Sequence, residues 1–412
     1  MNSKKKILFV ACRPPYPLDT GAKIRSYHIL AGLCSKYEVD VVVFREEVHD
    51  KEWQRTAVQL GIGKLIQLEN PLINTSATGA MFLKAVLKQL PVTVLKYQSI
   101  QLLDTIRELI EEDYSLLHLE HMHLAWLLHH INTPGLLYSL DAHNVETQIA
   151  ERMCDMEPSL IRKAALALHA RNMQKFETHA FKNTHFIMTV SNEDQSLINL
   201  KAGSTTSVSL VENGVDVDYF RPEEICLTGE RLNLVFVGSM DWLPNIDGVK
   251  WFAEESFPLI KEKYPECTFT VVGRNPHESI AELAQRFAGI HITGTVDDVR
   301  PYVNKASVVV VPLRYGGGTR LKILEAFAMG KPVVSTTLGC EGIEYTNNEH
   351  LIRADTAEEI AVKCGELLSN HNLSNQIGNK ARELALESYS WDSIIGTMLN
   401  SLEMHLDYLQ KR

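Results

Sequence analysis

The sequence predicts an α/β protein built from two doubly wound domains, each with a mainly parallel sheet covered by helices on both faces. Three observations support this fold class. The chain has 412 residues, more than one ordinary hydrophobic core accommodates. Short apolar, β-branched runs alternate with longer helical stretches, which is the pattern of βαβ units. The alternation then begins again past the middle of the chain, which favours two successive sheets.

The first half begins with a strand, a long helix and a second strand. Three further strands follow, and polar residues stand at or near their ends. Because ligands of doubly wound sheets bind beyond the carboxyl ends of the strands, those polar residues are candidates for a site. The expected elements are strands at 7–11, 39–44, 116–119, 136–141 and 186–190, with a helix at 23–36.

The second half repeats the alternation and ends in a helical region. We place the domain boundary within 201–231, which is rich in Gly, Ser, Thr and charged residues. The expected domains are 1–203 and 204–389, with 390–412 forming a C-terminal helix that returns to the first domain. One sheet with a long insertion is the alternative, which the restarted pattern disfavours. The expected elements are strands at 232–238, 268–273, 291–293, 307–312 and from 333, with helices at 247–263, 277–287, 296–304 and from 357.

Composition narrows the class of protein. Apolar residues make up 45% of the chain and charged residues 22%, the balance of a globular protein. The formal net charge of −10 disfavours nonspecific binding to nucleic acid, because phosphate neutralisation needs a basic face. The seven cysteines never form a Cys-x-x-Cys pair, which suits a reducing cytoplasm and disfavours disulfides or a zinc site.

No segment predicts insertion into a membrane. The apolar run after the N-terminal lysines is too short for a signal peptide, and no stretch reaches the ~20 apolar residues of a membrane span. We therefore expect a cytoplasmic protein. Two basic amphipathic stretches, 81–90 and 162–171, are candidates for peripheral contact with the inner face of a membrane. Docking of these helices on a sheet is the alternative.

The most informative segment runs from 308 to 334. It contains a strand of valines, three consecutive glycines and an amphipathic helix that Thr319 opens and Gly330 closes. Glycines let backbone N–H groups approach a ligand closely, and a helix N-terminus adds partial positive charge. The segment therefore predicts a phosphate site, and a flexible turn is the alternative. The three glycines are Gly316, Gly317 and Gly318.

Three basic side chains, Arg314, Arg320 and Lys322, surround this predicted site. Cations at the start of a helix oppose the helix dipole, so their placement favours a bound anion over a solvated helical turn. Glu325 lies three residues after Lys322, so both side chains lie near one helix face. The segment is typical of a protein that binds a diphosphate and recognises a hydroxylated group beside it.

Segment 311–336, VPLRYGGGTRLKILEAFAMGKPVVST, resembles the donor-binding segment of glycosyltransferase family 4. Segment 237–252 resembles the first strand–loop–helix of the C-terminal domain of these enzymes, and 211–216 resembles their Asn-Gly-Val-Asp turn. In the first half, 13–21 and Arg25 resemble their first glycine-bearing loop. The resemblance therefore spans nearly the whole chain.

This resemblance implies the GT-B fold, in which two Rossmann-like domains face each other across a cleft. It implies a retaining glycosyltransferase that moves a sugar from a nucleoside diphosphate sugar to an acceptor hydroxyl, in surface polysaccharide or glycolipid assembly. The expected partners are a nucleotide-sugar donor and a glycan or lipid-linked acceptor. Helix N-termini, glycine amides and basic side chains can neutralise a leaving diphosphate, so we expect no cofactor and no metal.

The resemblance also assigns residues. Segment 141–144 resembles the strand end that carries an active-site histidine, so His143 is the candidate catalytic residue. A hydrogen-bonded structural histidine is the alternative. Glu325 is expected to bind the ribose hydroxyls. The candidate donor-binding residues are Gly21, Gly238, Arg314, Gly316, Gly317, Gly318, Thr319, Arg320, Lys322 and Glu325, and the candidate acceptor-side residues are Arg13, Arg25, Glu120 and His121.

The sequence departs from the family pattern at two places. Many members carry a glutamate near the donor sugar where Gly317 stands. The Arg and Lys that often follow the first C-terminal strand are replaced by Met-Asp-Trp at 240–242. One of the three basic side chains around the glycine segment is expected to supply the missing charge, and the sequence does not decide which.

His121 and His123 form an i, i+2 pair after another predicted strand. No carboxylate cluster in the sequence completes a metal site with them, so we predict contact with the acceptor and no metal ligand.

Three rival functions use parts of the same pattern. A non-hydrolysing nucleotide-sugar epimerase would need acid–base carboxylates that the sequence does not identify. A phosphorylase would need a phosphate site and a pyridoxal lysine motif. A non-catalytic nucleotide-sugar-binding protein fits the glycine at Gly317. The base and sugar of the donor, the acceptor and the oligomeric state stay open.

Overall fold

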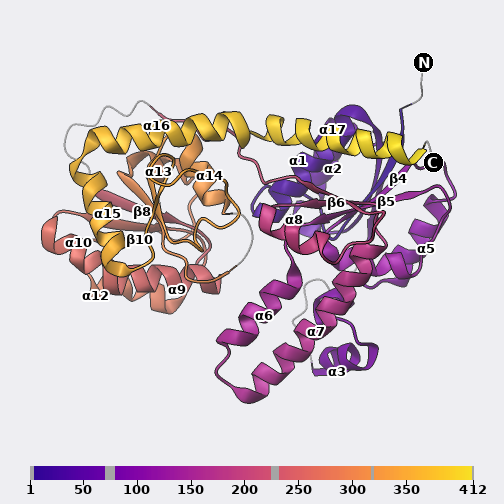
Figure 1. Cartoon of the computed structure of the whole chain (residues 1–412), viewed down its shortest axis with the longest axis horizontal. Helices are drawn as coiled ribbons and strands as arrows, with labels where there is room; N and C mark the ends of the chain where they lie inside the picture. The colour runs from indigo at the N-terminus through magenta and orange to yellow at the C-terminus, as the bar shows by residue number, and fades with distance from the viewer. Residues whose placement is uncertain (1–3, 70–78, 224–231, 317–319, 411–412) are drawn as a thin grey trace. The chain divides into compact units, whose positions relative to one another are not determined.

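The computed structural model describes residues 4–69, 79–223, 232–316 and 320–410 (Figure 1). The candidate donor residues Gly317, Gly318 and Thr319 lie outside the described residues. The chain divides into two compact units, residues 1–212 with 395–412, and residues 213–394. Each unit has its own parallel sheet with helices, which confirms the predicted α/β class of two Rossmann-like domains.

Unit 1 is built on a seven-stranded parallel sheet. The strands follow the order β3-β2-β1-β4-β5-β6-β7, so the direction of winding reverses between β1 and β4. Ligands of doubly wound sheets bind outside the carboxyl ends of the strands at this kind of switch point. The strands are β1 (Lys6–Ala11), β2 (Glu38–Phe44), β3 (Leu65–Leu68), β4 (Leu116–Glu120), β5 (Leu137–Ala142), β6 (Phe186–Thr189) and β7 (Ser207–Leu210).

Some helices of unit 1, among them α1 and α8, begin at residues whose side chains cap the helix. The Thr20 hydroxyl accepts from the Lys23 N–H at the start of α1, and the Ser191 hydroxyl accepts from the Asp194 N–H at the start of α8. The helices are α1 (Gly21–Lys36), η1 (Glu47–His49), α2 (Asp50–Gln59), α3 (Gly79–Lys88), α4 (Val92–Leu95), α5 (Ile100–Leu109), η2 (Met122–His129), α6 (Glu146–Met156), α7 (Leu160–Lys182) and α8 (Asn192–Asn199).

Unit 2 is built on a six-stranded parallel sheet with the order β10-β9-β8-β11-β12-β13. The four valines of β11 are fully buried because helices cover both faces of its sheet, which is why the sequence reads as a continuous apolar run. The strands are β8 (Asn233–Val237), β9 (Thr268–Val272), β10 (Ile290–Ile292), β11 (Val308–Val311), β12 (Val333–Ser335) and β13 (Ile352–Arg353).

Two of the expected helices of unit 2 are interrupted. The expected helix at 247–263 is instead α9, a π-helical turn and α10 in succession, and the expected helix at 277–287 divides into α11 and α12. The elements are α9 (Leu243–Trp251), η3 (Phe252–Ser256), α10 (Phe257–Lys263), α11 (Glu278–Ala281), α12 (Leu283–Arg286), α13 (Arg300–Lys305), α14 (Leu321–Ala328), α15 (Ala357–Ser369) and α16 (His371–Ser388).

The last helix, α17 (Trp391–Gln410), packs on unit 1 over most of its length. It lies against α1, where a Cβ atom added to Gly32 would stand 2.4 Å from the Ile395 side chain. A salt bridge of 2.6 Å between Lys36 and Glu403 adds a polar contact along the same pair of helices. None of the helices in the described parts of the chain is long and apolar enough to cross a membrane.

Candidate functional site

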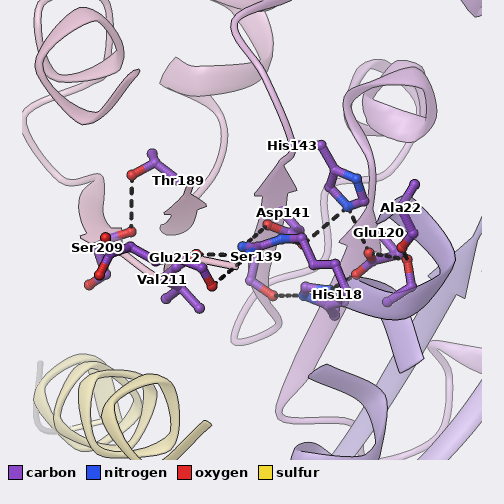
Figure 2. Close-up of polar contacts among 12 residues, drawn as sticks. Ala22, His118, Glu120, Ser139, Asp141, His143, Thr189, Ser209, Val211 and Glu212 are labelled. Atoms are coloured by element: carbon purple, nitrogen blue, oxygen red, sulfur yellow. Dashed lines mark hydrogen bonds and ion pairs between the residues drawn. The ribbon is translucent and has the colours of Figure 1, made fainter. Parts of the chain in front are cut away.

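The first candidate site lies at the carboxyl ends of β4 and β5 in unit 1 (Figure 2). Glu120 ends β4 and pairs in register with Asp141 of β5, so the two carboxylates stand side by side. His143 follows β5 directly. Its Nε2 lies 2.9 Å from the Glu120 carboxylate and 3.2 Å from the Asp141 carboxylate. The strand ends therefore bring together the histidine and two acidic residues.

The neighbouring carboxylates determine the protonation state of His143. Burial alone would lower the pKa of His143, but Asp141 and Glu120 raise it to about 9. Burial would likewise raise the pKa of Asp141, and the charges of Arg25 and His143 lower it well below its usual range. The site thus holds an imidazolium between two carboxylates at neutral pH.

Arg25 of α1, a candidate acceptor-side residue, is a buried partner of this network. Its guanidinium donates two hydrogen bonds of 2.7 Å to Asp141. Nη1 donates to the carbonyls of Val211 and Glu212 at 2.8 and 3.1 Å. The side chain is 2% exposed because a fully buried carboxylate requires a counter-charge beside it. Arg25 therefore positions Asp141.

Replacing Arg25 by Met should destabilise unit 1 by about 3–5 kcal/mol, because Asp141 would keep a buried charge without its partner. The shift of the urea denaturation midpoint measures this effect. The matched control is Lys36→Met, which removes the more exposed salt bridge to Glu403 and should cost at most about 1 kcal/mol. Equal losses in the two variants would contradict the assigned role of Arg25.

Glu120 is held from a second side by residues that the sequence did not single out. His118 Nε2 lies 3.0 Å from its carboxylate, and the Ser26 hydroxyl donates to it at 2.6 Å. His118 Nδ1 in turn lies 2.8 Å from the Ser139 hydroxyl. Glu120, a candidate acceptor-side residue, is 2% exposed, and it too positions His143. Alternate residues of a strand point to the same face of the sheet, so His118 shares a face with Glu120 and Ser139 shares a face with Asp141. This alternation could have identified His118 and Ser139 from the sequence.

The remaining candidates of unit 1 lie around this network. Gly21 is the first residue of α1. The Arg13 side chain is 44% exposed and donates to the Tyr97 hydroxyl at 3.4 Å. His121 is half-buried, and its ring centroid lies 5.0 Å from that of His143. Arg13 and His121 thus keep exposed surface near the carboxyl edge of the sheet.

The second candidate site lies at the carboxyl end of β8 in unit 2. The Lys322 ammonium donates to the Asn245 side chain at 3.0 Å and lies 4.0 Å from the centre of the Phe236 ring. A Cβ atom added to Gly238 would stand 2.8 Å from this ammonium. A Cβ added to Gly273 would stand 1.7 Å from the Gly238 carbonyl oxygen, so the ends of β8 and β9 require two glycines.

The three candidate cations of unit 2 have different surroundings. Lys322 contacts Gly238, next to the segment where the family pattern has its missing basic residues. Arg314 is half-exposed and forms a two-point ion pair with Asp247 at 2.5 and 2.9 Å. The Arg320 side chain is buried, and a Cβ added to Gly316 would stand 3.1 Å from its guanidinium. Gly316 has a φ of 119°, which only glycine adopts readily.

Lys322 and Glu325 both titrate close to neutral pH. Burial and the charge of Arg320 together lower the pKa of Lys322 to about 7, although the charge of Glu325 opposes this shift. Burial also raises the pKa of Glu325 to about 7, against the opposing effect of Lys322. Both side chains are half-buried on α14. A bound anion would stabilise the ammonium form, and a bound hydroxyl group would stabilise the carboxylate form.

The chain is similar to known proteins in both sequence and fold. Residues 231–370 match the family model described as "Glycosyl transferases group 1". A GDP-mannose-dependent alpha-(1-6)-phosphatidylinositol monomannoside mannosyltransferase of Mycobacterium tuberculosis is 23% identical over 242 residues, which cover 53% of this chain and 62% of that protein. The chain spans about half the length of the curated relatives it matches.

Two solved structures share the fold over almost the entire chain. Sucrose-phosphate synthase from Thermosynechococcus elongatus superimposes with a TM-score of 0.70 at 15% identity, covering 97% of this chain and 99% of that one. Alr3699/HepE of Anabaena, solved in complex with UDP-glucose, superimposes with a TM-score of 0.66 at 13% identity and the same coverage of 97% and 99%. At these identities the likeness establishes the fold.

Proposed function

We propose that this chain is a retaining glycosyltransferase that moves a sugar from a nucleoside diphosphate sugar to an acceptor hydroxyl. The observation that carries the proposal is the position of Lys322 beside Gly238, at the carboxyl end of β8, together with the electrostatic coupling of Lys322 to Glu325 on the same helix. This pairing offers a cation for a diphosphate and a carboxylate for ribose hydroxyls within one helical turn. The group 1 family match covers these same residues.

In the proposed reaction the protein stabilises negative charge on the leaving diphosphate. Lys322 and backbone amides at the start of α14 supply positive charge, so the diphosphate needs no divalent metal. We assign no double displacement, because the described acidic pair of Glu120 and Asp141 is neutralised by Arg25 and His143. The proposed route is front-face transfer, with the leaving diphosphate assisting deprotonation of the acceptor.

The proposed setting is the assembly of surface polysaccharide or glycolipid. The name of the mannosyltransferase relative, which includes a phosphatidylinositol monomannoside, supports a lipid-linked acceptor. Contact with a membrane stays a prediction. The two stretches considered for it expose large apolar side chains, namely Leu83 and Leu87 in 81–90 and Leu168 in 162–171.

A thermal-shift panel of UDP-, GDP- and ADP-sugars tests the proposed donor class. For one of the nucleotide bases, both the free nucleoside diphosphate and its sugar derivatives should bind and raise the unfolding temperature. Binding without turnover in the presence of acceptors would favour the non-catalytic sugar-nucleotide protein. No shift with any nucleotide would contradict the proposal.

Donor binding should take up a proton at about pH 8. Lys322 is then mostly uncharged, and a diphosphate beside it raises its pKa, so up to about one proton is taken up and affinity falls as pH rises above 7. Calorimetry in two buffers of different ionisation enthalpy measures the uptake. The control is Lys322→Arg, whose guanidinium stays charged and should bind without uptake. Uptake that persists in Lys322→Arg would refute this role.

A further inference from the structure

Three polar side chains of unit 1 form a separate cluster beside the network around His143. His121 and His123 lie where β4 passes into η2, and Glu146 is the first residue of α6. One ligand atom from each lies within 4.8 Å of the other two. We propose that His121, His123 and Glu146 bind a divalent transition-metal ion of the zinc type.

The backbone holds His121 in an unusual conformation. Its φ of 107° lies in a region that residues with a Cβ rarely adopt. Such strain persists where the surrounding structure requires it, and it is frequent at functional sites. In this conformation the ring stacks on His123 with centroids 4.2 Å apart. His121 Nδ1 accepts from the His123 N–H at 3.3 Å, so Nε2 carries the ring proton in this arrangement. Coordination through Nε2 would require the proton to move to Nδ1 and this long hydrogen bond to break.

His123 presents a buried ring nitrogen. Its Nε2 is closed to solvent and has no hydrogen-bond partner among the described residues. A buried polar atom without a partner destabilises the folded protein. Tyr97 stacks on the ring with centroids 5.4 Å apart and fixes its plane. Coordination of an ion through Nε2 would satisfy this nitrogen.

Two acidic residues, Glu146 and Glu177, lie on the side of the cluster formed by the start of α6. The Glu146 backbone N–H donates to the Glu177 carboxylate at 2.6 Å, so two acidic residues meet at the start of α6. The nearby cations are Arg13 and His143, and each already faces carboxylates of its own. Arg13 lies 3.9 Å from Glu46, and His143 is held by the acidic pair of the network. The acidic groups at the start of α6 would have to offset these two cations when a dication binds.

The donor set selects the kind of ion. Two imidazole nitrogens and one carboxylate are typical of zinc sites with an open fourth position, whereas magnesium and calcium prefer oxygen ligands. Zinc bonds of about 2.0–2.1 Å require the three ligand atoms to converge from their present separations. The other acidic group, Glu120 with Asp141 and His143, also has its ligand atoms within 4.8 Å, but Arg25 and the imidazolium already neutralise it.

Isothermal titration with Zn²⁺ and with Mg²⁺, after removal of metal by a chelator, tests the proposal. We expect one zinc ion per chain and no magnesium binding. His123→Ala and Glu146→Gln should each weaken zinc binding by more than about 10-fold. His179→Ala is the matched control, because His129 and His179 also stack, with centroids 3.6 Å apart, but form no such cluster with a carboxylate in the described residues.

Unchanged zinc binding in both His123→Ala and Glu146→Gln would overturn the proposal, as would an equal loss in His179→Ala. Thermal unfolding without metal checks that the variants are folded. Glu146→Gln keeps the size of the side chain, so it serves as the decisive variant if His123→Ala unfolds. Neither measurement depends on transferase activity.

Discussion

Replacing Glu325 by Ala should weaken binding of the nucleoside diphosphate by about 10- to 100-fold. The reason is that hydrogen bonds to a charged acceptor contribute about 1.5–3 kcal/mol, and a tenfold change in affinity corresponds to about 1.4 kcal/mol. Glu325 is half-buried on α14 beside Lys322, where a pKa raised to about 7 favours a partner that stabilises the carboxylate. Calorimetric titration with the donor nucleotide measures the loss.

The control for this variant is Glu358→Ala, which removes an exposed carboxylate of α15 in the same unit. Its affinity for the nucleotide should equal that of the unmodified protein. Glu325→Gln separates charge from shape, because it keeps one acceptor oxygen and should lose less affinity than Glu325→Ala. Unchanged affinity in Glu325→Ala would remove the proposed contact with the ribose.

His143→Ala should lower kcat by about 10²- to 10⁴-fold, the range for loss of a positioned proton donor or acceptor. Nucleotide affinity should change much less, because Lys322 and Glu325 are intact. Glu120 and Asp141 hold Nε2, so we propose that the other edge of the ring meets the reacting sugar. Steady-state kinetics combined with nucleotide titration separates the two effects.

His371→Ala is the matched control for His143→Ala, since His371 is exposed at the start of α16. It should leave kcat and nucleotide affinity unchanged. If His143→Ala retains full kcat, the histidine is a structural part of the network. That outcome would support the alternative stated from the sequence.

The strands that position both sites could be predicted because buried parallel strands produce unbroken apolar runs. The expected strand at 39–44 corresponds to β2, and the expected strand at 268–273 corresponds to β9. The short strands β3 and β7 have no such run, since most of their residues are only half-buried. The divided helices of unit 2 were also missed, because an apolar stripe continues across a π-helical turn.

The strand-end rule placed His143 and Glu120 together, but it could not supply their partners. Arg25 and Asp141 are 116 positions apart, and no local pattern records that contact. The rule also failed to predict a carboxylate beside His121 and His123. Glu146 completes the cluster from a helix that follows the next strand, so only the folded chain brings the three side chains together.

Release of nucleoside diphosphate from a panel of nucleotide sugars tests the central claim most directly. The purified protein should cleave donors of one base, and an acceptor should accelerate the release. Release should fall sharply in Glu325→Ala and His143→Ala and stay unchanged in Glu358→Ala. A protein that binds the nucleotide but releases no diphosphate from any sugar derivative, with glycan and lipid-linked acceptors present, would contradict the assignment as a glycosyltransferase.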